Sequence, residues 1–180
     1  MSGGLPKLFS KNKPLNEMPS YADLPLEDTS STFTVRASWN TPEWLDVAFG
    51  EIGILEIAGD KDHPRIIEYL STVKLSKDMK LHDEIAWCAA SVNWILKTGG
   101  SKGTNKPNAK SYLDWGIKLL EPKFGCIVIL NRGTEAWQGH VGFFLDQSKG
   151  FVTLLGGNQN NRFGINKYKM SDIEGYRWPA

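Results

Sequence analysis

The C-terminal part of the 180-residue chain consists of short apolar runs separated by turn residues, and this spacing limits the folds open to it. The runs are rich in β-branched and aromatic residues, which is typical of strands. They cover residues 126–130, 140–145, 151–155, 165–169 and 176–178. Parallel strands need a crossover connection of about a dozen residues or more. The connections here are shorter than that, so we expect a mainly antiparallel sheet.

The segment before these runs carries helical patterns instead. Thr41 and Pro42 are typical of a helix start, because Thr caps the first turn and Pro lacks an N–H that would have no partner there. Two further helical patterns cover residues 63–73 and 83–100, the second with Asp83 as its cap and glycines at its end. Helices followed by strands predict an α+β domain with N-terminal helices packed on a mainly antiparallel β-sheet.

The chain divides into an N-terminal arm and one domain. Residues 1–40 contain recurrent prolines and no helical or strand period, so we expect an irregular arm that either wraps the domain or forms a flexible leader. Residues 41–180 have the length of a single domain, for which roughly 100–200 residues is usual.

Composition excludes several classes of protein. The chain has 21 Lys and Arg against 20 Asp and Glu, a net charge of +1, which argues against binding nucleic acid. No apolar stretch reaches the roughly 18 residues of a membrane span, and we expect no membrane insertion. The N-terminus lacks the apolar core of a secretory signal, so synthesis in the cytoplasm is expected. We expect a monomer with no cofactor and no metal.

The two cysteines differ in their surroundings. Cys88 lies near the N-terminal end of the clearest predicted helix, where the backbone amides carry partial positive charge that favours a thiolate. The alternative for Cys88 is a structural role, because cysteine is a small and frequently buried residue. Cys126 opens a wholly apolar run and is expected in the core.

Two polar residues follow at positions that antiparallel strands bring together. His140 begins a predicted strand directly after a loop that contains Trp137, and Asn158 follows the next strand. When a short turn joins two antiparallel strands, the start of one lies beside the end of the other. Cys88, His140 and Asn158 would supply a nucleophile, a base and a group that orients the base, as in cysteine hydrolases.

Four sequence blocks in this order carry a family resemblance. They are Ala86–Trp94 (AWCAASVNW), Gly125–Ile129 (GCIVI), Gly139–Phe144 (GHVGFF) and Leu155–Asn160 (LGGNQN). Together they resemble the CHAP-type cysteine amidohydrolases, relatives of the NlpC-type peptidases. The resemblance implies a papain-like α+β fold and cleavage of an amide bond in bacterial peptidoglycan, by an amidase or an endopeptidase.

The resemblance also assigns roles to residues. Cys88 is expected as the nucleophile, His140 as the base and Asn158 as the orienting residue, with Gln159 as the local alternative because the family varies at this third position. Trp87, Trp137 and Gln159 are expected to contact the substrate, a peptidoglycan peptide.

The expected place of action is the periplasm or cell wall of a target bacterium. The protein would reach it as an antibacterial effector delivered by a machine such as type VI secretion, or as a phage-type lysin. An immunity protein is the further partner expected of an effector.

Two alternatives belong to other classes of protein. The first is a catalytically silent module that binds the cell wall or a peptide, with Trp87, Trp115 and Trp137 lining a groove. The second is a metal site built from Cys88, His140 and Cys126, although their spacing matches no zinc pattern.

Overall fold

A computed structural model describes residues 41–59, 61–76, 81–83 and 85–180, so the arm expected over residues 1–40 lies outside the described residues. Helices precede strands along the chain. The elements are α1 (Glu43–Gly50), α2 (Pro64–Ser71), α3 (Cys88–Thr98), the 3₁₀ helix η3 (Ala109–Asp114), β1 (Ile117–Leu119), β2 (Ile127–Asn131), β3 (Gly139–Ser148), β4 (Phe151–Gly156), β5 (Gly164–Lys169), the 3₁₀ helix η4 (Met170–Asp172) and β6 (Ile173–Trp178).

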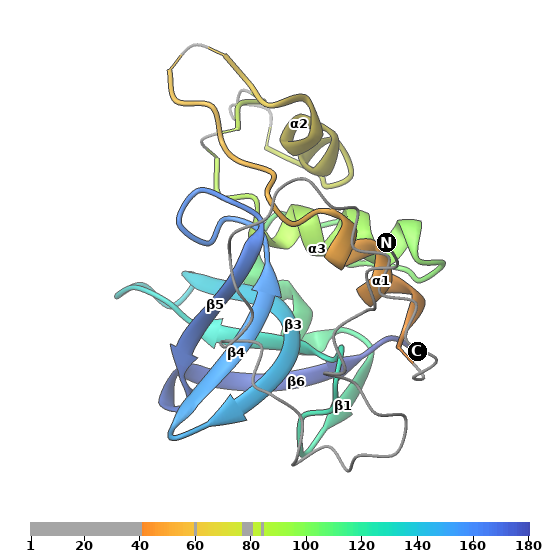
Figure 1. Cartoon of the computed structure of the whole chain (residues 1–180), viewed down its shortest axis with the longest axis vertical. Coiled ribbons are helices and arrows are strands. Elements are labelled where there is room, and N and C mark those ends of the chain that lie inside the picture. Colours follow the sequence, from red (N-terminus) through yellow and green to blue (C-terminus); the bar gives the residue numbers. More distant parts are fainter. Residues whose placement is uncertain (1–40, 60, 77–80, 84) are drawn as a thin grey trace, which may run out of the picture. The chain divides into compact units, whose positions relative to one another are not determined.

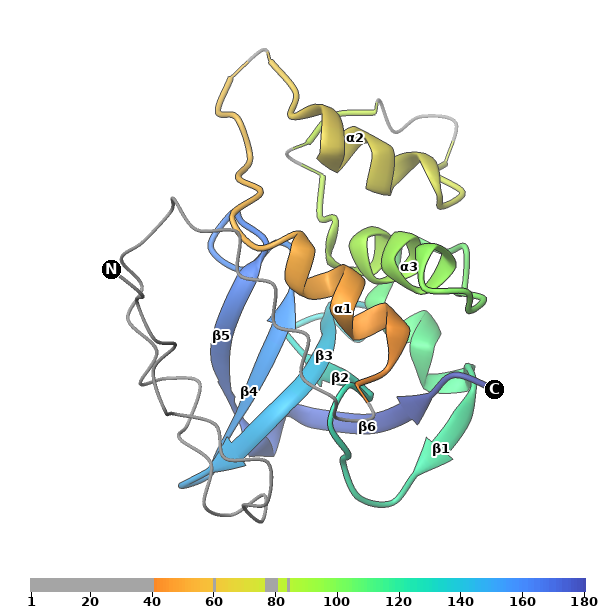
Figure 2. The same cartoon turned by 45° about the vertical axis from the view of Figure 1, so that its right-hand side comes forward.

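The strands form one six-stranded sheet in the order β1-β6-β2-β3-β4-β5, and every neighbouring pair in it is antiparallel. Helices α1, α2 and α3 gather on one side of this sheet (Figures 1 and 2). The predicted α+β class, with N-terminal helices packed on an antiparallel sheet, is therefore confirmed. None of the described helices is long and apolar enough to cross a membrane.

Alternate residues of β2 belong to two different apolar clusters, because successive side chains of a strand point to opposite faces of the sheet. Ile127 and Ile129 belong to the cluster that includes the helices. Val128 and Leu130 belong to a second cluster on the other face of the strand, and Cys126 joins it with no exposed surface. The expectation that Cys126 is a core residue is confirmed.

Strands β3 and β4 form a hairpin and cover the residues that the sequence predicts for them. β3 and β4 are joined at Lys149 and Gly150, which both have positive φ, as a two-residue turn of type I′ needs. Strand β1 was not expected from the sequence. It is only three residues long, too short to give a period of its own, and it pairs with β6.

Helix α3 begins later than the sequence indicates. Its first residue is Cys88, and Asp83 is not its cap. The buried carboxylate of Asp83 instead accepts the backbone N–H groups of Ile57 at 3.0 Å and His63 at 2.8 Å. Asp83 therefore bonds the amides of a neighbouring loop, and the shorter helix has Cys88 at its N-terminal end.

The other helices start within one residue of the predicted positions. Pro42, and not Thr41, is the N-cap of α1. Helix α2 starts at Pro64 and is capped by His63, whose Nδ1 accepts the N–H of Arg65 at 3.2 Å.

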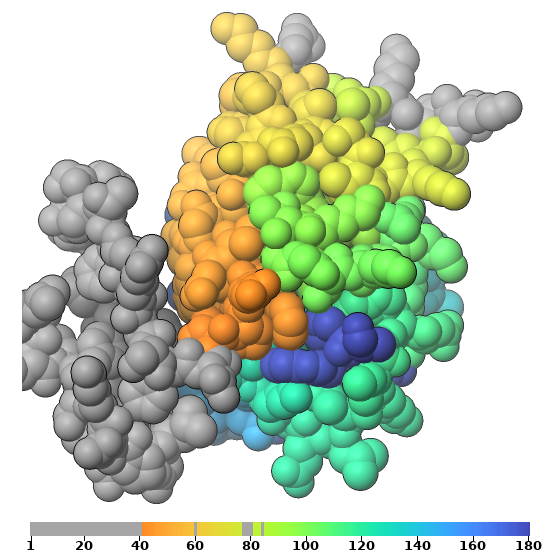
Figure 3. Space-filling view, turned by 90° about the vertical axis from the view of Figure 1, so that its right-hand side faces the viewer, coloured from red at the N-terminus to blue at the C-terminus, as the bar shows by residue number. Residues whose placement is uncertain are grey.

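An aromatic pair joins helix α1 to β6, the last strand of the chain. Trp44 packs edge-on against Trp178 of β6, with ring centroids 5.0 Å apart, and its Nε1 donates to the carbonyl of Gly125 at 2.9 Å. Figure 3 shows the resulting surface, where α1 (orange) meets the C-terminal residues (blue) beside α3 (green).

The loop after β4 passes very close to helix α3. A Cβ atom added to Gly157 would lie 2.3 Å from Cζ3 of Trp87 and 2.5 Å from Oγ of Ser91. Trp87 has no room to yield, because it is fully buried and its ring stacks on that of Tyr69.

We therefore expect Gly157→Ala to lower the free energy of unfolding by about 1–3 kcal/mol through overpacking. Gly50→Ala is the matched control, because nothing lies within 4 Å of its added Cβ. Urea denaturation of the three proteins measures the difference. Equal stability of Gly157→Ala and the wild type would contradict this close packing.

Candidate active site

Cys88 is the first residue of α3 and is 5% exposed. Its thiol lies within hydrogen-bonding reach of the backbone N–H of Val141, the residue that follows His140. Burial raises the pKa of the Cys88 thiol, and it outweighs the backbone amides of Val141 in β3 and Ala89 in α3, which lower that pKa. At neutral pH the resting group is therefore a thiol.

His140 lies near the start of β3, paired with Leu130 of β2, and has no exposed surface. Burial lowers its pKa to about 4, and the positive charge of Arg132 acts in the same direction. The hydrogen bond with Gln159 acts to raise the pKa. At neutral pH His140 is therefore an uncharged imidazole, which is the form that accepts a proton.

Gln159 fixes the orientation of this imidazole. Its Oε1 lies 3.3 Å from Nε2 of His140. Its Nε2 donates to the carbonyls of Leu154 at 3.3 Å and Gly156 at 3.1 Å, and to that of Gly164. All three are acceptors, so the amide nitrogen must face them and the oxygen must face His140. A ring nitrogen that faces an acceptor must carry the proton, so His140 has its hydrogen on Nε2.

The other ring nitrogen of His140 is therefore unprotonated. Nδ1 is buried and has no hydrogen-bond partner within the described part of the chain. A buried lone pair without a donor is unusual, because most buried polar atoms are paired. It leaves Nδ1 able to accept a proton from a thiol.

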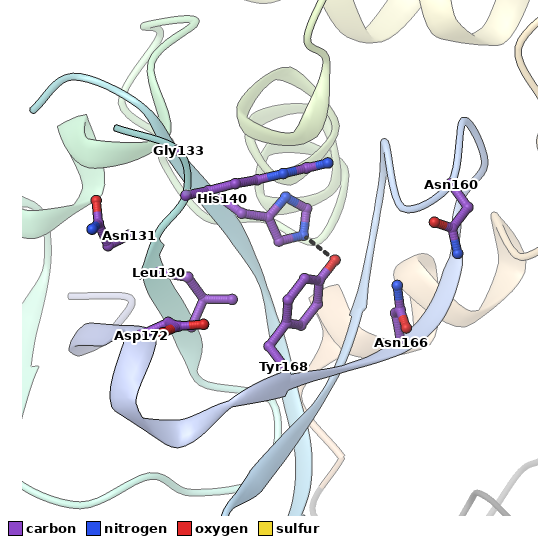
Figure 4. Close-up of a pocket in the computed structure, with 9 residues that line it drawn as sticks. Leu130, Asn131, Gly133, His140, Asn160, Asn166, Tyr168 and Asp172 are labelled. Carbon is purple, nitrogen blue, oxygen red and sulfur yellow. Dashed lines mark hydrogen bonds between the residues drawn. The ribbon is translucent and has the colours of Figure 1, made fainter. Parts of the chain in front are cut away.

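Tyr168 of β5 is a contact of His140 that the sequence analysis missed. Its hydroxyl lies 3.2 Å from Nε2 of His140, and the two ring centroids are 5.0 Å apart (Figure 4). Burial raises the pKa of Tyr168 to about 12, so the phenol stays protonated. A tyrosine inside a predicted strand gives no signal of this role, because aromatic residues are common in strands.

Asn158 does not make the expected contact. The prediction places the end of β4 beside the start of β3, and the register from Phe143 to Leu155 agrees with it. Among the described residues, however, no hydrogen bond joins Asn158 to His140, and the next residue makes that bond instead. Asn158 has a φ of 56°, a left-handed conformation that asparagine tolerates, and the residue after it, Gln159, is directed inward and only 3% exposed.

The two tryptophans expected at the substrate have different positions. Trp87 is fully buried, and its Nε1 donates to Glu56 at 3.3 Å, so it has no surface to offer a substrate. Its place directly before Cys88 in the sequence does not indicate this burial, because the burial depends on the packing of Tyr69 and Gly157 against the ring. Trp137 is 66% exposed on the loop before β3, where a ligand can reach it.

A pocket of about 430 Å³ opens beside His140. Figure 4 shows His140 and Tyr168 between Asn131 on one side and Asn160 and Asn166 on the other. The lining consists of Leu130, Asn131, Arg132, Gly133, His140, Asn160, Asn166, Tyr168 and Asp172.

Side chains that could hold a metal ion gather elsewhere. In the described ranges the one such group is Asp62, His82 and Asp83, whose donor atoms lie within 4.8 Å of one another. Cys88, Cys126 and His140 do not form such a group among the described residues.

Comparisons with known proteins give distant structural neighbours. No family model and no curated protein matches the chain. The solved structure of the endolysin LysIME-EF1 is similar at 16% identity and a TM-score of 0.41, over 64% of this chain and 63% of that one. A protein similar to lipoprotein, of the NLP/P60 family, from Staphylococcus aureus subsp. aureus Mu50 is similar at 17% identity and a TM-score of 0.47, over 84% and 44%. The chain thus spans less than two thirds of either protein.

The low pKa of His140 predicts how stability depends on pH. The unfolded chain takes up a proton on this histidine below its ordinary pKa of 6.5, whereas the folded protein does so only near 4. Acid therefore favours unfolding. Proton uptake by His140 in the unfolded chain should lower the free energy of unfolding by about 3 kcal/mol between pH 7 and pH 4.

Denaturant unfolding of the wild type and His140→Gln across this pH range measures the effect. The variant should lose correspondingly less stability on acidification, because the other titrating groups are common to both proteins. Parallel curves for the two proteins would contradict a neutral, buried His140.

Proposed function

We propose that this chain is a cysteine hydrolase that cleaves an amide bond in the peptide part of peptidoglycan. The state of His140 is the main support. Its Nε2 is held by Gln159 while its Nδ1 is unprotonated, buried and without a partner, on a strand whose next residue contacts the Cys88 thiol. A base with one nitrogen oriented and the other free is what a thiol nucleophile needs.

In the proposed mechanism the thiol loses its proton only as it reacts. The sulfur of Cys88 attacks the carbonyl carbon of the amide while Nδ1 of His140 takes the thiol proton. The N–H groups in the first turn of a helix have no partner inside the helix, so the backbone N–H of Cys88 can bind the negative oxygen that forms. The imidazolium then gives its proton to the leaving amine, and a thioester remains on Cys88.

The second half returns the enzyme to its starting state. His140 takes a proton from a water molecule, which attacks the thioester and releases a carboxylic acid. The proton then returns to the sulfur of Cys88, so the thiol and the neutral imidazole are restored. Gln159 touches only the imidazole in this scheme and is a positioning residue.

The substrate class comes from the resemblance to the CHAP-type enzymes. We propose that a peptidoglycan peptide binds in the pocket beside His140. The exposed Trp137 on the loop before β3 is proposed as a further contact of this peptide. The delivery route, as an effector or as a lysin, and an immunity protein as a partner belong to the same proposal.

One observation favours a second candidate, a catalytically silent peptide-binding module. Burial raises the pKa of the Cys88 thiol, and a thiol is a far weaker nucleophile than a thiolate. A binding module would keep its pocket and lose nothing when the sulfur is removed.

We expect Cys88→Ala and His140→Ala to abolish cleavage of purified peptidoglycan fragments, since the nucleophile and the base are then missing. Mass spectrometry of the fragments after incubation measures this and identifies the bond. Cys126→Ala is the matched control and should cleave like the wild type, with folding checked by circular dichroism. Intact fragments with the folded wild type would favour the binding module.

A second experiment separates Gln159 from Asn158. We expect Gln159→Leu to lower kcat by roughly 10²-fold, the usual scale for disturbed acid–base catalysis, because the imidazole loses its orienting partner. Nitrogen-15 NMR of His140 should then no longer show hydrogen on Nε2 alone.

The matched control is Asn158→Gly, since glycine keeps the positive φ of this position. It should leave kcat and the NMR signature unchanged. If Asn158→Gly changes both and Gln159→Leu changes neither, Asn158 is the orienting residue.

A further inference from the structure

Arg132 brings a positive charge to the pocket beside His140 that the proposed mechanism does not use. It is exposed at the end of β2 and lines this pocket. Within the described residues no hydrogen bond or ion pair engages its guanidinium. Arg65, by contrast, is paired with Glu51 at 3.2 Å and Glu68 at 2.6 Å. A guanidinium without an internal partner on the wall of a pocket is available to a ligand.

Side-chain amides line the same pocket. Oδ1 of Asn131 accepts Nζ of Lys110 at 3.1 Å, and Oδ1 of Asn166 accepts the backbone N–H of Lys167 at 2.9 Å. The Nδ2 group of Asn131 can donate to a ligand, whereas the side chain of Asn166 also lies within hydrogen-bonding reach of the Tyr168 hydroxyl. In Figure 4 Asn131 and Asn166 lie on opposite sides of Tyr168, so a side-chain amide lines each side of the pocket.

One acidic side chain, Asp172, lines the same pocket. No ion pair joins it to Arg132 in the part of the chain that the structure describes. The charge of the guanidinium is therefore not cancelled by direct contact.

We propose that Arg132 binds a free carboxylate of the substrate, so that the enzyme selects peptides with an acidic group near the scissile amide. This proposal rests on the proposed function. A guanidinium binds a carboxylate through two parallel N–H donors, which fixes position as well as charge. Peptidoglycan peptides carry such carboxylates, and amidation converts some of them to neutral amides of nearly the same shape.

The electrostatics place this carboxylate close to the reaction. The charge of Arg132 lowers the pKa of both Cys88 and His140, so the guanidinium lies near both groups. A carboxylate bound to it would hold the peptide within reach of the thiol, and positioning of this kind contributes directly to the rate.

The test uses pairs of peptidoglycan fragments that differ only in one carboxylate, free or amidated. We expect the wild type to prefer the acidic fragment in kcat/KM by at least about tenfold, the scale of a charge-assisted hydrogen bond. Arg132→Gln should lose this preference through a higher KM for the acidic fragment, and Arg132→Lys should keep part of it. Lys118→Gln, an exposed cation on β1, makes the same change in charge and should behave like the wild type.

Binding separates this proposal from the proposed function. Isothermal titration of the acidic fragment into Cys88→Ala, with and without Arg132→Gln, needs no catalysis, and we expect the affinity to fall by at least about tenfold. Cleavage by Arg132→Gln with wild-type kcat/KM for both fragments would overturn the carboxylate site and leave the hydrolase intact. If no protein cleaves either fragment, the hydrolase fails, and equal affinities in the titration would overturn the carboxylate site as well.

Discussion

The hydrogen bond between Gln159 and His140 links the loop after β4 to the chemistry of the site. Gln159 can present its oxygen to the imidazole only because its nitrogen is held by carbonyls at the ends of β4 and β5. The tautomer of His140, meaning which ring nitrogen carries the hydrogen, therefore depends on the register of these strands. The inward direction of Gln159 in turn follows a left-handed turn at Asn158, and Gly157 lets this loop pass against α3.

Burial at the site disfavours the charged forms of both residues, the thiolate of Cys88 and the imidazolium of His140. It raises the pKa of Cys88 and lowers that of His140, so the resting pair is neutral. Three features lower the pKa of the thiol against this effect, namely the backbone N–H of Val141 in β3, the amides at the start of α3 and the positive charge of Arg132. The site therefore holds a protonated thiol beside a neutral imidazole.

Several expectations from the sequence are confirmed because they depend on local physics. Strand spacing and connection length are properties of short segments, so the antiparallel sheet could be inferred without knowing the packing. The apolar run after Cys126 identified it as a core residue. The starts of the helices were less accurate, because Asp83 has the composition of a cap but bonds the amides of Ile57 and His63, which are distant in sequence.

The sequence by itself determined the class of fold, the order of its elements and the segments that hold Cys88 and His140. Those features follow from the periods of hydrophobic residues and from turn chemistry, which act within a few residues. Only the tertiary structure decided that Gln159 faces His140, that Trp87 is buried, and that Tyr168 joins the site. The side chains of neighbouring residues in a turn point in different directions. The composition of the turn does not determine which of them points inward. Contacts between separate strands depend on register and twist, which are fixed only when the whole core packs.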